Sequence, residues 1–103
     1  MNRVKFIRDE IQEFLLSFDD DTVQKVIHSL EILNDLGEQI RPPKSKKVAR
    51  DIYELRIFGN LPVRIFYAFY ENNIWVLNAF IKKSQKIPPK ELRIVINRFK
   101  LLQ

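Results

Sequence analysis

The sequence contains no cysteine, only two glycines and a single histidine among its 103 residues. Without cysteine there is no disulfide framework, no thiolate nucleophile and no zinc site of the usual kind. Two glycines are too few for a glycine-rich phosphate loop, and the lone His28 leaves no plausible members for Ser/His/Asp catalysis and no paired-histidine metal motif. We therefore expect neither a metal nor another cofactor.

Long apolar runs are also missing. No run in the chain approaches the roughly 20 residues that a membrane span needs, and the charged first residues do not resemble a secretory signal. These features predict a cytoplasmic protein with no membrane contact. A chain of 103 residues is long enough to bury one core, so we expect residues 1–103 to form a single domain.

Charge is distributed unequally along the chain. Residues 1–40 hold four Lys/Arg against nine Asp/Glu, whereas residues 41–103 hold fourteen against four. Solvated surface charge explains part of this pattern. A basic half is also the electrostatic footprint of a protein that binds a polyanion, although charge alone does not distinguish RNA, DNA and an acidic protein.

The basic half begins with a region that predicts a sheet. Three runs rich in β-branched and aromatic residues are separated by residues typical of turns, at Gly59-Asn60 and at Glu71–Asn73. We interpret this region as an antiparallel meander of three strands, at Ile52–Phe58, Pro62–Tyr70 and Ile74–Ile81.

Helical periodicity is found on both sides of the meander. Apolar residues between 7 and 18 predict a first helix of about three turns, and Arg3–Ile7 before it fits either a short edge strand or the lead-in to that helix. A second helix is expected over residues 21–36, with an aspartate before it as cap and Gly37 as its end. Pro89–Leu102 fits a closing helix that packs on the core as a lid or is partly displaceable. The fold class is therefore α+β.

The segment from Ile40 to Arg50 connects the helices to the meander. Its prolines forbid a helix, and its lysines make it basic. We interpret this segment as a loop that is either simply solvated or a contact for phosphates.

Four cations lie on or beside the meander, near one carboxylate and three tyrosines. These residues are Arg56, Arg64, Lys82, Lys83, Glu54, Tyr53, Tyr67 and Tyr70. Such a set suits transesterification of RNA at its own 2′-hydroxyl, because the substrate supplies the nucleophile and arginine can bind two phosphate oxygens at once. The base could be Glu54, a tyrosine or a lysine. A surface that only binds RNA would look much the same.

Three motifs in this order resemble a known family. Tyr53–Arg56 (YELR), Val63–Tyr67 (VRIFY) and Ala79–Pro88 (AFIKKSQKIP) are similar to the signature of the HigB-like, phage-derived branch of the RelE/ParE toxin superfamily. The basic stretch at residues 44–47 and the two N-terminal helices also fit this branch. Some RelE relatives carry a second cation where this chain has Glu54, and a tyrosine in a C-terminal region where this chain has none.

The resemblance implies a RelE-like fold and the toxin of a type II toxin–antitoxin pair. Such toxins are typically metal-independent endoribonucleases that cut mRNA in the ribosomal A site, and a helix-turn-helix (HigA-like) antitoxin neutralises them. The resemblance also implies that Arg56 and Arg64 stabilise the phosphate that is cut.

The remaining site residues are assigned partly on the same resemblance, for Lys82, Lys83, Lys46 and Lys47, and partly on residue type and position alone. Lys82 and Lys83 would bind substrate, one of them serving in proton transfer, and Glu54 completes the catalytic set. RNA contacts are expected from Lys44, Lys46, Lys47, Arg50 and Lys86. Two other hypotheses remain: a non-catalytic RNA- or ribosome-binding module, and a domain that docks an acidic protein.

Overall fold

The computed structural model describes residues 3–103. Its elements follow in the order β1 (Val4–Phe6), α1 (Asp9–Leu16), α2 (Asp20–Leu36), the short 3-10 helix η1 (Gly37–Gln39), β2 (Ser45–Ala49), β3 (Ile52–Ile57), β4 (Val63–Tyr70), β5 (Asn73–Ile81) and α3 (Pro89–Leu102). None of the helices in this part of the chain combines the length and apolar character that a membrane crossing requires.

The five strands form one sheet in the order β1-β5-β4-β3-β2. Strands β2 to β5 pair antiparallel, and β1 pairs parallel with β5. The predicted three-stranded meander is confirmed as β3, β4 and β5. The two-residue turn between β4 and β5 places Glu71 and Asn72 in the left-handed region (φ 49° and 66°), a conformation that suits a tight hairpin.

Strand β2 corrects one prediction. We expected a connecting loop from Ile40 to Arg50, but Ser45–Ala49 pairs with β3, with Ser45 opposite Leu55. Pro42 and Pro43 remain in the turn that precedes the strand, so their missing N–H groups remove no ladder bond. The prolines exclude a helix in this segment, but they do not prevent a strand from following them. The lysines after the prolines therefore lie along the edge of the sheet.

The N-terminal segment contains the edge strand, which was one of the two alternatives at Arg3–Ile7. The first helix is shorter than the predicted three turns. It begins at Asp9, because the preceding residues pair with β5, and it ends at Leu16, where the amide and hydroxyl of Ser17 both donate to the carbonyl of Phe14. Phe18 packs on the core from beyond the helix end.

Helix α2 has the predicted boundaries within one residue. Asp19 is its N-cap, since its carboxylate accepts from the Thr22 amide at 3.1 Å and from the Thr22 hydroxyl at 2.7 Å. Gly37 ends the helix with φ 53°, and a Cβ there would lie 2.8 Å from the Arg3 guanidinium. His28 is exposed on the outer side of this helix.

The Asp19 cap makes the stability of the fold depend on pH in the acidic range. The hydroxyl and then the amide of Thr22 hold the pKa of Asp19 below its ordinary value of 3.8. A carboxylate with a depressed folded-state pKa stabilises the fold fully above 3.8, and this contribution is lost as pH falls through the lower folded-state value. We expect Asp19→Ala to lower the urea midpoint at pH 7, with the difference from the parent shrinking below pH 3.8. Glu31→Ala, on the exposed face of the same helix, serves as the control, and a difference that does not change with pH would contradict the assignment.

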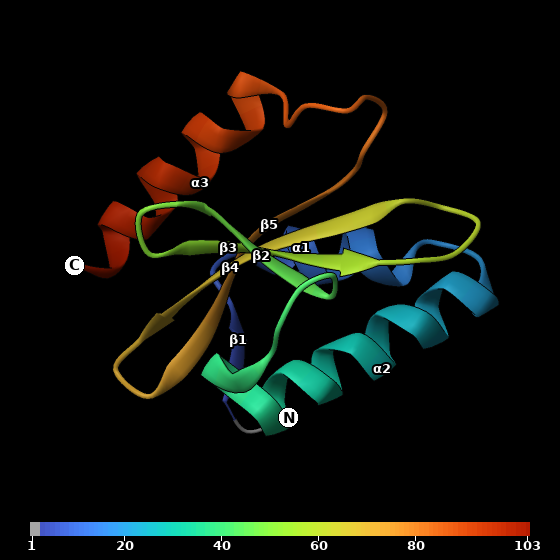
Figure 1. The fold of residues 1–103 in the computed structure, drawn as a ribbon, viewed down its shortest axis with the longest axis horizontal. Helices are drawn as coiled ribbons and strands as arrows, with labels where there is room; N and C mark the ends of the chain where they lie inside the picture. The colour runs from blue at the N-terminus through green and yellow to red at the C-terminus, as the bar shows by residue number, and fades with distance from the viewer. Residues whose placement is uncertain (1–2) are drawn as a thin grey trace.

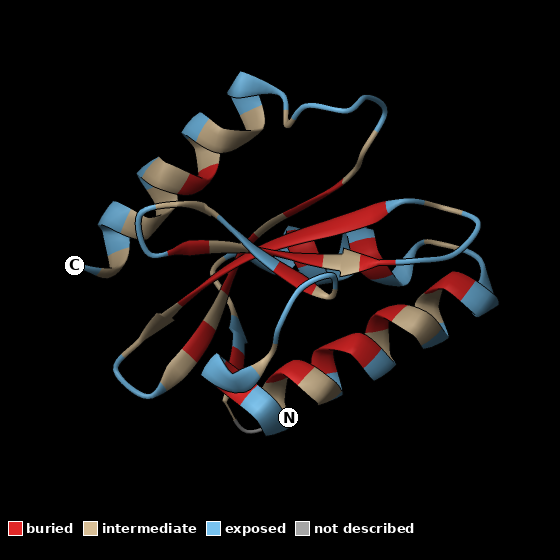
Figure 2. Ribbon diagram, viewed as in Figure 1, coloured by how far each residue is buried: buried red, intermediate tan, exposed pale blue. Residues whose placement is uncertain are grey.

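The sheet lies between two helical layers (Figure 1). On one face α1 and α2 cover a core that includes Leu30, Leu33, Leu55, Ile65 and Tyr67. On the other face α3 covers a smaller core of Ile52, Phe66, Ala68, Leu77, Phe80 and Val95. Figure 2 shows that burial is concentrated in the central strands and on the inner side of α2, whereas α3 has one short buried stretch.

Helix α3 is held to β5 by polar contacts as well as by apolar packing. The Arg98 guanidinium donates to the carbonyl of Leu77 at 2.7 Å, and Asn78 Nδ2 donates to the Glu91 carboxylate at 2.7 Å. The apolar stripe of α3 therefore faces the sheet, which agrees with the prediction of a helix that packs on the core.

Candidate active site

Strand register brings the two arginines together. Arg56 on β3 lies directly opposite Arg64 on β4, so both side chains share the sheet face that α3 covers farther along. The β5–α3 connection reaches the same end of the sheet, where the Lys82 amide donates to the Pro62 carbonyl at 2.9 Å. Figure 1 shows the β3–β4 turn and this connection together at that end.

An open hollow of about 580 Å³ lies between these segments, and we call it the cationic hollow. Its lining consists of Arg56, Pro62, Arg64, Lys82, Lys83, Ser84 and Gln85. Four residues predicted to act on the phosphate are therefore gathered around one space, although they come from three separate stretches of the chain. A concentration of positive charge in an open, polar hollow is suited to binding a phosphodiester.

Arg64 is the most constrained of the four cations. Only 7% of it is exposed, and its Nη1 donates to the carbonyl of Val63 at 3.0 Å and to that of Ile57 at 3.5 Å. Burial lowers the pKa of Arg64, while the charge of Glu54 acts in the opposite direction. The ordinary pKa of arginine is so high that the side chain stays protonated at neutral pH. A fixed cation of this kind is already oriented before a phosphate arrives.

Glu54 lies beneath the arginines instead of in the hollow. It is 1% exposed, and its Oε1 lies 3.7 Å from Nε of Arg56. Its other oxygen has no hydrogen-bond partner within residues 3–103. In this conformation the carboxylate is too buried to reach the 2′-hydroxyl of an RNA. Its contribution here is electrostatic, because it offsets the repulsion between two neighbouring guanidiniums.

The tyrosines are not part of the cationic hollow. Tyr53 and Tyr67 stack on the opposite face of the sheet with ring centroids 5.6 Å apart, and the Tyr67 hydroxyl is paired with Ser45. Burial raises the pKa of Tyr67. Tyr70 lies at the other end of β4, beside the β4–β5 turn. The structure therefore removes the tyrosines from the candidates for the base.

The predicted RNA contacts are divided between the two faces of the sheet. Lys46 lies opposite Glu54 and shares the face of the arginines, whereas Lys47 lies opposite Tyr53 and points to the other face. Lys44 donates to the Ser29 hydroxyl at 2.7 Å, and burial lowers its pKa. Lys86 is exposed in the β5–α3 connection. Within residues 3–103, none of these four lysines is among the residues that line the cationic hollow.

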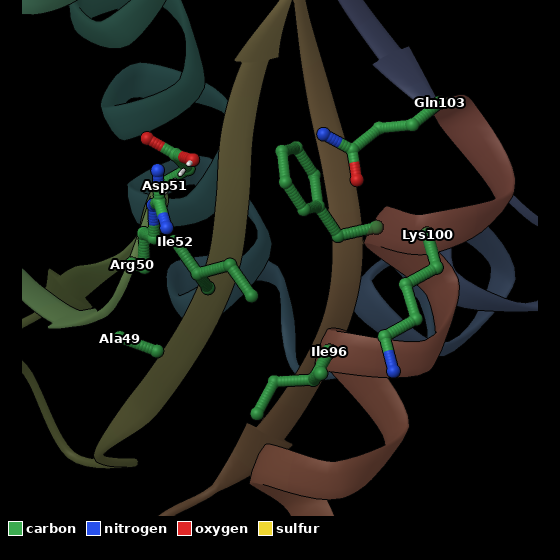
Figure 3. Close-up of a pocket in the computed structure, with 8 residues that line it drawn as sticks. Ala49, Arg50, Asp51, Ile52, Ile96, Lys100 and Gln103 are labelled. Atoms are coloured by element: carbon green, nitrogen blue, oxygen red, sulfur yellow. Dashed lines mark ion pairs between the residues drawn. The ribbon is translucent and has the colours of Figure 1, made fainter.

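Arg50 lies in a different place. It belongs to the β2–β3 turn, where its guanidinium is 4.0 Å from the Asp51 carboxylate. This turn borders a second hollow of about 460 Å³ beside the C-terminal half of α3, where Ile96, Lys100 and Gln103 form the far wall (Figure 3). The turn joins β2 and β3 at the end of the sheet away from the β3–β4 turn, so the structure does not bring Arg50 to the cationic hollow.

Sequence reasoning missed Phe58. The guanidinium carbons of Arg56 and Arg64 lie 5.8 and 5.9 Å from the centroid of its ring, and the residue is 55% exposed. It follows Arg56 by two positions and lies just beyond the end of β3, beside the two arginines. That spacing was the available signal, but Phe58 was counted only as part of an apolar run.

The five-stranded α+β fold carries a guanidinium-lined hollow at one end of its sheet, an arrangement suited to a phosphodiester or another polyanion. The chain belongs to the phage-derived protein Gp49-like family (DUF891), whose family model matches residues 13–100. This family is part of the HigB/RelE toxin group, whose members are typically ribonucleases with a cognate antitoxin. The resemblance to that group and the predicted RelE-like fold are therefore confirmed. A comparison with curated proteins gives no match.

Proposed function

We propose that this toxin-family protein is a ribosome-dependent endoribonuclease that cuts mRNA by transesterification at the 2′-hydroxyl and thereby inhibits translation. The observation that carries the proposal is the convergence of Arg56, Arg64, Lys82 and Lys83 on one open hollow. The match to a toxin family whose members are typically ribonucleases supports the same reaction class.

The reaction needs in-line attack of the 2′-oxygen on the adjacent phosphorus. The P–O bond to the 5′-oxygen breaks, and the products are a 2′,3′-cyclic phosphate and a free 5′-hydroxyl. Charge accumulates on the non-bridging oxygens in the transition state. Arg56 and Arg64 would bind these oxygens, and a preorganised donor of this kind typically contributes roughly 10²–10³ in rate.

Two protons must also move, one from the 2′-hydroxyl and one to the 5′-oxygen. Of the titratable side chains that line the hollow, the half-buried Lys82 and the exposed Lys83 remain for this role, because Arg56 and Arg64 would bind the phosphate oxygens. One of these two lysines would serve as the proton-transfer group. Glu54 would keep the arginines paired and oriented while remaining below the substrate.

A second function is favoured by a specific observation. No carboxylate, histidine or tyrosine is among the residues that line the cationic hollow in the described part of the chain. A surface that binds RNA or the ribosome without cutting it needs only the cations. This non-catalytic module on the same fold is the alternative that the first experiment must separate from the nuclease.

Membership of a toxin family implies a cognate antitoxin. We propose that this partner is a small helix-turn-helix protein of the HigA type, and that the substrate is mRNA in the ribosomal A site. A helix-turn-helix gene next to the toxin gene would support the pairing, and co-expression with that gene should relieve growth arrest.

The decisive experiment is primer extension on a defined mRNA that is translated in a reconstituted system. We expect new 5′ ends at codon boundaries when the protein and ribosomes are both present, and intact mRNA when ribosomes are omitted. Intact mRNA in the complete reaction, from a folded protein that binds RNA, would reject the nuclease in favour of the binding module.

The salt dependence of RNA binding tests the lysines separately from catalysis. Each phosphate contact contributes close to one unit to the slope of log K against log salt. We expect Lys83→Ala to flatten that slope by about one unit or slightly less in filter-binding assays with single-stranded RNA. Lys100→Ala, which removes the same charge beside the second hollow, should leave the slope unchanged. Equal slopes for Lys83→Ala and the parent would exclude Lys83 as a phosphate contact.

A further inference from the structure

An exposed aromatic ring separates two basic areas on the surface. Phe58 borders the cationic hollow through its contacts with the guanidiniums of Arg56 and Arg64. On its other side it lines a shallow hollow of about 190 Å³ with Lys25, His28, Ser29, Lys44 and Ile57. The two areas lie on different layers of the fold, because the second hollow is bordered by α2. A ligand that reaches from the cationic hollow to the hollow beside α2 must therefore cross the end of the sheet at Phe58.

We propose that Phe58 is a stacking platform for one nucleobase of single-stranded RNA, next to the phosphate held by Arg56 and Arg64. The proposal rests on the function proposed above and adds a base-binding subsite to it. Base stacking on an aromatic side chain is favourable for every base, because each base has a π-face. A strand that lies over Phe58 would place one phosphate in the cationic hollow and direct the next toward Lys44 and Lys25.

The placement of Phe58 favours a nucleobase over structural packing. A phenyl ring at the end of a strand is usually buried when its role is to fill the core, but Phe58 is 55% exposed and is absent from both apolar cores of residues 3–103. Its nearest charged partners are cations, which would repel a basic partner and attract a phosphate. An aromatic ring interleaved with guanidiniums is the arrangement that single-stranded nucleic acid recognition uses.

The β3–β4 turn holds the ring in place. The Arg64 guanidinium donates to the carbonyl of Ile57, immediately before Phe58. Gly59, immediately after it, lies so close to α2 that a Cβ would be 2.9 Å from Lys25 Nζ. The backbone on both sides of Phe58 therefore has little room to move, and the guanidiniums of Arg56 and Arg64 lie beside the ring itself before RNA binds. Such preorganisation reduces the entropy that stacking would otherwise cost.

The test uses a 2′-fluoro RNA hexamer, which lacks the internal nucleophile, with 2-aminopurine placed at successive positions. A matched set has an abasic site at the same positions. We expect the parent to quench 2-aminopurine at one position and to bind the base-containing hexamer there more tightly than the abasic one, by a factor of roughly 5 to 150. Phe58→Ala and Phe58→Leu should lose most of this factor, and Phe58→Trp should keep it.

Leu101→Ala removes another exposed apolar side chain, on α3, and should behave as the parent does. The proposal is overturned if Phe58→Ala discriminates between the two hexamers as well as the parent, or if Phe58→Leu retains the quenching. Failure of the proposed nuclease is seen in a different assay, as intact mRNA in the primer-extension reaction, and it leaves the hexamer result unchanged. If the parent and Arg64→Ala bind every hexamer equally weakly, the cationic hollow does not bind RNA and the stacking proposal is overturned as well.

Discussion

Replacing Arg64 with alanine is expected to lower ribosome-dependent mRNA cleavage by roughly 10²–10³-fold and to abolish growth arrest. The guanidinium is nearly buried, fixed by two backbone carbonyls and directly opposite Arg56. Alanine removes both the positive charge and the planar guanidinium donors of Arg64 from the position where the phosphorane would form. The measurement is the initial rate of cleavage by primer extension in the reconstituted system, together with growth after induction.

Two further variants separate chemistry from charge and from folding. Arg93→Ala removes one positive charge from an exposed position on α3 and should cleave at the parent rate. Arg64→Lys keeps the charge but not the planar fork, so we expect an intermediate rate. The urea midpoint of each variant shows whether it is folded. A folded Arg64→Ala protein that is as toxic as the parent would remove Arg64 from the mechanism.

The largest expected effect on stability comes from Phe66→Ala. Phe66 is fully buried between β4 and α3, and its ring lies 5.2 Å from that of Phe80, centroid to centroid. Truncating a buried phenylalanine costs about 3–5 kcal/mol, because transfer free energy and packing are both lost. A domain of this size has about 5–15 kcal/mol of stability in total. Urea denaturation should therefore show a midpoint far below that of the parent.

The same variant tests how firmly α3 is attached to the sheet. Leu101→Ala lies on α3 but is 72% exposed, and we expect it to change the free energy of unfolding by no more than about 0.5 kcal/mol. If Phe66→Ala costs less than about 1 kcal/mol, the small core under α3 is not closed in solution, since a large loss requires a buried site. That result would favour the displaceable helix over the packed one.

Local patterns in the sequence were sufficient to predict most of the elements. The runs of β-branched and aromatic residues and the turn residues between them located β3, β4 and β5, because a strand buried on both faces needs apolar residues throughout and its hairpin turns need special backbone conformations. Asp19 and Gly37 marked the ends of α2 through capping and a positive φ. The motifs around Arg56, Arg64 and Lys82 were specific enough to indicate the family, since their order and spacing follow the strands of the sheet.

Local patterns were less informative for the two outer strands, because Arg3–Ile7 fitted either an edge strand or the lead-in to a helix and Ser45–Ala49 was expected to be a loop. Val4–Phe6 and Ser45–Ala49 are short, and neither has a periodicity of its own. Strand β1 forms because Ile74–Val76, 70 positions farther along the chain, offers its N–H and C=O groups a partner, and no local window contains that pairing. Strand β2 pairs with the neighbouring Ile52–Leu55, and its basic sequence becomes a strand because β3 offers it an edge.

By itself, the sequence determined the class of fold, the family and the set of cations suited to a phosphate. Only the tertiary structure decided which side chains meet. It brought Arg56, Arg64, Lys82 and Lys83 to one hollow, buried Glu54 beneath them, directed Lys44 to α2 and left Phe58 exposed beside the arginines. The physical reason is that charge and residue type are local properties. Burial and proximity depend on strand register, and register is established only when the whole sheet has formed.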